Sequence, residues 1–242
     1  MPCPFSSPPR PDPVNPQSNR GTSARRSHGT ILLWVVNIGA WLPLLLLAFD
    51  AFTGRLTVNP IQAAEQRTGD IAITLLILSL ACTPLNTLLR WPSVLKARRP
   101  LGLYAYFYAF LHFLLFIGLD YGFNARLLLQ ALTEKPFILV GLAGFLLLSA
   151  LALTSFNTWK VRLGKNWKRL HRLTYLINLL IVLHFGWAVK GDFLRLQGDV
   201  FRPLLAGLVV LLLLGLRLPA VRRRLAGKLH TLLPSRKIHP ER

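Results

Sequence analysis

The 242-residue sequence is 52% hydrophobic and 16% charged, and its mean hydropathy is +0.44. This charge content is too low for an ordinary soluble domain. Lys and Arg number 29 against 9 Asp and Glu, which gives a net charge of +20. These basic residues lie between and beyond apolar blocks. We therefore interpret them as topology signals and lipid headgroup contacts, and we expect a lipid bilayer and no nucleic acid as partner.

Two motif classes are absent from the sequence. Its cysteines, Cys3 and Cys82, form neither a CxxC nor a CxxCH motif, which argues against iron–sulfur clusters, zinc and covalently attached haem. It also contains no G-x-G-x-x-G fingerprint, so NAD(P)H is not expected to bind here through a Rossmann module.

The chain begins with residues 1–29, a basic segment with seven prolines that we predict to be a disordered tail. Apolar blocks then follow at Ile31–Phe52, Ile71–Leu89, Leu101–Leu119, Phe137–Phe156, Leu170–Val189 and Pro203–Leu218. Most are long enough to cross a bilayer. They predict an all-α, polytopic six-transmembrane-helix bundle over residues 30–220, followed by a basic tail at 221–242.

Charges alternate along the predicted connections. The N-terminal tail, the second and fourth connections and the C-terminal tail are strongly basic, whereas the first, third and fifth mix both signs. The positive-inside rule then places both termini in the cytoplasm.

Three of the six histidines lie in predicted membrane helices: His112, His171 and His184. Ionisable groups there are costly and usually functional, although a neutral imidazole can serve as packing or a proton relay. In one continuous helix, His171 and His184 would lie roughly 20 Å apart, one near each membrane face. His112, on a parallel helix, reaches nearly the depth of His184. Such an arrangement suits haem, which takes two axial imidazoles from facing helices. Anionic propionates would then need cations near the surface, for which Arg98, Arg169 and Arg172 are candidates.

Three motifs carry a resemblance to a known family. They are T-G-D-I-A-I at residues 68–73, R-R-P-L-G-L-Y-A-Y-F-Y-A-F-L-H-F at 98–113 and L-G-K-N-W-K-R-L-H-R-L-T-Y at 163–175. Over roughly residues 30–220 the sequence resembles MsrQ (YedZ), the haem-binding membrane subunit of the bacterial protein-methionine-sulfoxide reductase system. This family belongs to the wider ferric-reductase-like transmembrane group.

The resemblance implies a set of ligands. The wider group holds two haems between its third and fifth helices, each bound by a pair of histidines. His112 and His184 match the outer pair, so one haem b is expected there. His171 matches the inner position of helix five, but Arg98 stands where a partner histidine would be. The inner site could therefore hold a second haem with a different ligand or a flavin, and the family resemblance implies FMN.

We expect the protein to conduct electrons across the membrane. The donor would be a cytoplasmic flavin or flavin reductase, or the quinone pool. The resemblance implies that the membrane is the bacterial inner membrane and that the acceptor is a periplasmic molybdopterin subunit, MsrP, which repairs methionine sulfoxide in oxidised proteins. Two alternatives stay open. One is a ferric or oxygen reductase, which usually carries a fused flavin and NAD(P)H domain; the other is a non-redox transporter or scaffold.

Overall fold

The computed structural model describes residues 17–189, 191–192, 197–198, 200–218 and 221. Within them the chain is helical apart from a two-stranded hairpin, which confirms the all-helical class. The elements are α1 (Gln17–Phe52), α2 (Pro60–Leu89), α3 (Val94–Leu115), the π-helix η1 (Phe116–Asp120), α4 (Ala125–Glu134), α5 (Pro136–Leu153), α6 (Asn157–Leu163), α7 (Lys165–Leu170), α8 (Leu173–Ala188), β1 (Gly191–Asp192), β2 (Gln197–Gly198) and α9 (Phe201–Gly215).

Four described helical segments are long and apolar enough to cross a membrane: Gly29–Phe52, Pro60–Leu89, Val94–Asp120 and Pro136–Leu153. The last two predicted blocks form α8 and α9, of 16 and 15 residues. Both are shorter than the roughly 20 residues that a spanning helix needs. The count of six spans and the cytoplasmic termini therefore stay predictions.

Two helices begin earlier than the sequence suggested. α1 begins at Gln17, so residues 17–29, which we predicted to belong to a disordered tail, are helical. α2 begins at Pro60 because the Asn59 side chain caps it by accepting from the Gln62 N–H, and proline suits the first helical position. Residues 1–16 and 222–242 lie outside the described residues.

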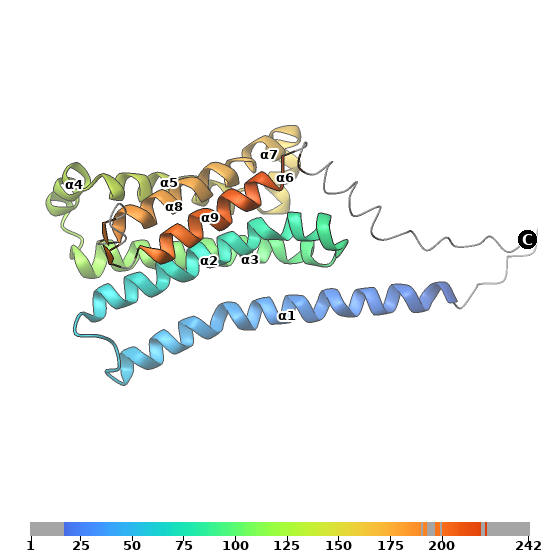
Figure 1. Ribbon diagram of the computed structural model, residues 1–242, viewed down its shortest axis with the longest axis horizontal. Helices are drawn as coiled ribbons and strands as arrows, with labels where there is room; N and C mark the ends of the chain where they lie inside the picture. Colours follow the sequence, from blue (N-terminus) through green and yellow to red (C-terminus); the bar gives the residue numbers. More distant parts are fainter. Residues whose placement is uncertain (1–16, 190, 193–196, 199, 219–220, 222–242) are drawn as a thin grey trace, which may run out of the picture.

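The helices run lengthwise beside one another, with α1 along one side (Figure 1). α2 packs most extensively on α3, and α5 on α8. Two names are used below. The His184 end is where α2 begins and α3 and α8 finish. The His171 end is the opposite one. Figure 1 shows α4 at the first of these and α6 and α7 at the second.

The core lies between α2, α3, α5 and α8 and is filled by apolar side chains, among them Ala105, Tyr108 and Ile177, each fully buried. The outward faces carry exposed large apolar residues, such as Trp34 and Leu45 on α1. A bundle with an apolar exterior is stable when lipid surrounds it.

α1 is joined to the bundle by polar contacts as well. The Tyr104 hydroxyl lies 2.8 Å from the Asn37 side-chain oxygen, and the buried Tyr108 hydroxyl donates to the Ala40 carbonyl. Ala40 lies one turn before Pro43, whose missing N–H weakens the helix at that point.

We expect Tyr108→Phe to lower the stability of the bundle by about 1 kcal/mol, because the hydrogen bond from the Tyr108 hydroxyl to the Ala40 carbonyl is lost inside the apolar layer. Thermal unfolding in a fixed detergent measures this. Tyr121→Phe is the control, since its hydroxyl meets Lys135 in an exposed position. Equal midpoints for both variants would contradict the assigned role of Tyr108.

Candidate histidine site

Two histidines on different helices are held in the same way. Nδ1 of His112, on α3, lies 2.9 Å from the Glu65 carbonyl of α2. Nδ1 of His184, on α8, lies 2.8 Å from the Phe137 carbonyl of α5. A carbonyl oxygen can only accept, so Nδ1 carries the hydrogen in each neutral ring. Nε2 of both rings therefore keeps its lone pair, which is the state of a histidine that is ready to bind a metal.

A glycine accompanies each of these contacts. Gly69 lies one helical turn after Glu65, and a Cβ there would be 3.4 Å from the His112 ring. Gly141 lies one turn after Phe137, and a Cβ there would be 2.6 Å from the His184 ring. The second distance is too short for any side chain. The glycines thus make the hollows in α2 and α5 into which the imidazoles fit.

The imidazole rings of His112 and His184 lie close to each other inside the bundle. Their centroids are 6.3 Å apart and their planes are inclined by 79°. An imidazole nitrogen binds a first-row metal at about 2 Å, so two opposed imidazoles with one metal between them need about 6 Å between their centres. Among the described residues, α3 and α8 are not one of the closely packed helix pairs. These residues fit a bis-histidine centre carried by two helices that hold a planar group between them.

His171 lies at the opposite end of the bundle from His112 and His184, and it is not inside a long helix. It caps the end of α7, and α8 begins only at Leu173, so His171 and His184 do not share one helix as the sequence suggested. The Trp167 ring stacks on His171 at 4.1 Å, and the Trp167 indole donates to the Thr154 carbonyl at 2.9 Å.

The three predicted arginines separate into two groups. Arg98 is partly buried on α3, with Nη1 3.5 Å from the Thr83 hydroxyl, and its charge acts on His171. Arg169 and Arg172 are exposed on either side of His171. The structure thus brings Arg98 towards His171, and leaves the other two on the surface of the same end.

Stacked aromatic rings from α3 and α5 line the interior near His112. Phe113 lies 4.6 Å from Phe145, and Tyr106 lies 6.1 Å from the same ring. Tyr106 is six residues before His112, towards the His171 end. These rings keep the interior between the two histidine regions apolar.

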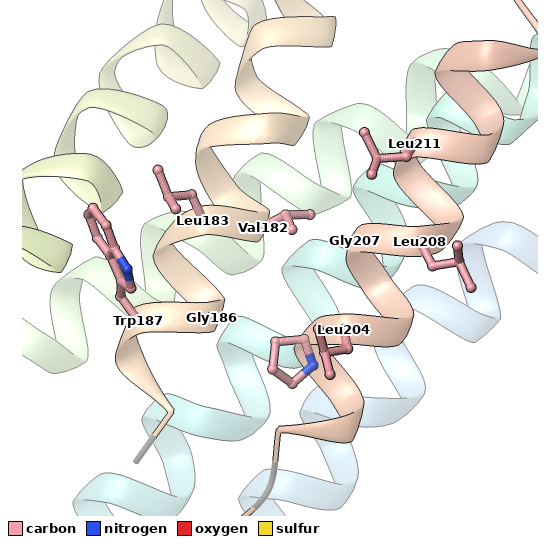
Figure 2. Close-up of a pocket in the computed structure, with 9 residues that line it drawn as sticks. Val182, Leu183, Gly186, Trp187, Leu204, Gly207, Leu208 and Leu211 are labelled. Carbon is pink, nitrogen blue, oxygen red and sulfur yellow. The ribbon is translucent and has the colours of Figure 1, made fainter. Parts of the chain in front are cut away.

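An apolar groove of about 430 Å³ lies between α8 and α9 (Figure 2). Its lining includes Val182, Leu183 and Trp187 of α8 and Leu204, Leu208 and Leu211 of α9, together with the glycines Gly186 and Gly207. Its walls offer no charged group and no metal ligand. The groove suits a hydrocarbon chain, and the histidine pair is not part of its lining.

The sequence pointed to the histidines but missed the groups that orient them. Gly69 lies inside the T-G-D-I-A-I motif and Gly141 inside an apolar helix, and neither was singled out. A glycine within an otherwise apolar helix is a weak signal of close approach. Which side chain approaches it depends on the packing of a second helix.

We expect Gly141→Ala to lower the stability of the protein, because its methyl group would displace the His184 ring from the Phe137 carbonyl. The loss should be about 1–2 kcal/mol, the cost of one buried hydrogen bond. Gly69→Ala should lower the stability less, because its added methyl group would lie 3.4 Å from the His112 ring, which is close to an ordinary van der Waals contact. Gly39→Ala is the matched control, with no atom within 4 Å of the added carbon. Thermal unfolding in detergent would contradict the arrangement if Gly141→Ala unfolded no earlier than Gly39→Ala.

Known proteins are similar in sequence to this chain over most of its length. Residues 68–182 match the family model described as ferric reductase like transmembrane component. A protein of Herminiimonas arsenicoxydans is 40% identical over 189 residues, which cover 78% of this chain and 84% of the relative. A relative from Bordetella pertussis is 43% identical over 170 residues, which cover 70% of this chain and 80% of the relative. One from Caulobacter vibrioides is 39% identical over 164 residues, which cover 67% of this chain and 78% of the relative. All three are named protein-methionine-sulfoxide reductase heme-binding subunit MsrQ. The four apolar spans agree with a multi-pass membrane protein, and the chain belongs to the MsrQ family of bacterial ferric-reductase-like transmembrane proteins.

Proposed function

We propose that this chain is a haem-binding electron-transfer subunit of a protein-methionine-sulfoxide reductase, in which His112 and His184 would hold the iron of one haem b. The observation that carries this is the opposed histidine pair, in which each Nδ1 is bonded to a backbone carbonyl and each Nε2 is free. The names of the relatives, which describe heme-binding subunits, support the choice of group.

The chain's own residues would bind and orient the haem. The Glu65 and Phe137 carbonyls fix both imidazole planes and make the rings better ligands. Phe113 and Phe145 keep water from the interior beside His112. When bound, the iron of the haem supplies one-electron redox chemistry.

We propose a second cofactor at the His171 end, either FMN or a second haem. His171 is only partly buried there and is braced by Trp167. Arg98, Arg169 and Arg172 supply positive charge for the anionic groups of either cofactor. This end would face the cytoplasm and receive electrons from a flavin, a flavin reductase or the quinone pool.

Electrons would leave at the His184 end to a periplasmic molybdopterin subunit, MsrP, in the bacterial inner membrane. Methionine sulfoxide would be reduced on that partner, which restores the apolar thioether. This chain's part is then to hold a redox centre at the right depth, and we assign it no residue that acts on the sulfoxide.

We expect the purified protein to show a low-spin b-type absorption spectrum, with at least one haem per chain. His112→Ala and His184→Ala should abolish the low-spin signal, because each removes one axial ligand. His171→Ala is the matched control and should keep it. Absorption of the oxidised and reduced protein, with a haem count, measures this. Unchanged haem content in His184→Ala would refute the ligand assignment, and no haem in the unmodified protein would refute the redox function.

We also expect the dithionite-reduced protein, freed of excess reductant under argon, to be reoxidised by MsrP when a methionine-sulfoxide peptide is present. The reoxidation rate should rise at least tenfold over that with MsrP and an unoxidised peptide, because only the sulfoxide accepts electrons. Stopped-flow absorption follows the reaction. The same slow rate with both peptides would exclude MsrP as the electron acceptor.

A further inference from the structure

Arg217 is held rigidly at the His171 end, just beyond α9. Its Nη1 donates to the Tyr175 hydroxyl of α8 at 2.9 Å, and its Nη2 donates to the Leu80 carbonyl of α2 at 2.6 Å. Pro84 explains the second contact: it has no N–H for the carbonyl four residues before it, so Arg217 supplies the missing donor. The guanidinium is therefore fixed between α2, α8 and α9.

A second guanidinium lies near the first. Nη1 of Arg98, on α3, lies 3.5 Å from the Thr83 hydroxyl, and Thr83 is about one turn along α2 from Leu80, whose carbonyl accepts from Arg217. This long contact to Thr83 is the one hydrogen bond that Arg98 makes to a side chain among the described residues. Two cations from different helices are thus brought together in a partly buried region.

No described carboxylate neutralises these cations. Those with described side chains belong to the His184 half of the bundle, and two of them are paired there, Asp50 with Arg67 and Asp70 with Arg202. Nε of Arg217 is buried and has no partner among the described residues. The Tyr175 hydroxyl accepts from Arg217, and its own hydrogen has no acceptor in the same part of the chain.

Partly buried charges without a counter-ion are costly, and they are stabilised by an anion. Guanidinium groups match the oxygen geometry of phosphate, and a phosphate monoester can carry about two negative charges, as many as the pair can neutralise. We propose that Arg98, Arg217 and Tyr175 form an anion site that binds the phosphate group of a ligand at the His171 end. This deepens the part of the proposed function that places a second cofactor there, and it does not depend on haem binding at the other end.

The test compares FMN with riboflavin, which has the same ring system but no phosphate, by quenching of flavin fluorescence in the purified full-length protein. We expect FMN to bind at least tenfold more tightly than riboflavin, and inorganic phosphate to compete with it. Arg98→Gln and Arg217→Gln should each remove most of this difference. Arg99→Gln is the matched control, because Arg99 is the next residue along α3 and is exposed.

The phosphate could instead come from a lipid headgroup, and a second arm tests this source. Phosphatidylglycerol that remains with the purified protein is counted by mass spectrometry. If the site holds a lipid phosphate, the unmodified protein retains this lipid and Arg217→Gln retains several-fold less. The proposal is overturned if FMN binds no better than riboflavin and Arg217→Gln retains as much lipid as the unmodified protein.

Arg217 also supports α2, so Arg217→Gln could fail to fold. In that case Arg217→Lys, which keeps the charge, should retain the preference for FMN. Thermal unfolding of the unmodified protein gives a further readout: inorganic phosphate should raise the midpoint more than chloride at equal ionic strength, and equal effects would overturn the proposal. The low-spin spectrum of the haem proposed to bind His112 and His184 is recorded separately. A normal spectrum without phosphate preference would refute this inference alone.

Discussion

The site depends on one interaction made twice: a histidine Nδ1–H donated to a backbone carbonyl of a neighbouring helix. In water such a bond contributes little, but in an apolar layer its loss leaves the ring N–H without a partner. It fixes the tautomer and the plane of each imidazole at the same time. Because the carbonyls belong to α2 and α5, these two helices determine where the rings on α3 and α8 can lie.

The helices of the bundle pack in pairs that match these two hydrogen bonds. α2 packs on α3 and α5 packs on α8, and each pair consists of one helix with a histidine and one with a glycine hollow. The two pairs meet where the imidazole rings lie close to each other. Another polar contact in the apolar layer joins two helices: the Tyr108 hydroxyl of α3 donates to the Ala40 carbonyl of α1.

The two ends of the bundle differ in charge, and this difference gives them different chemistry. Described carboxylates gather towards the His184 end, where Asp50 pairs with Arg67. The His171 end holds Arg98 and Arg217, which have no counter-ion among the residues that the structure describes, together with exposed basic residues on α6 and α7. The haem site proposed at one end and the anion site proposed at the other are consistent with the proposed transfer of electrons from one membrane surface to the other.

The sequence by itself determined the helical class, the membrane setting, the family and the histidines, because apolar block length and rare intramembrane imidazoles are local signals. It did not determine where His171 lies, since the break between α7 and α8 leaves the apolar pattern intact. Only the tertiary structure decided that Gly69 and Gly141 receive the imidazole rings and that Arg217 joins Arg98. Each of these contacts joins residues from helices far apart in the chain, and their geometry depends on how the helices pack, which residue order does not show.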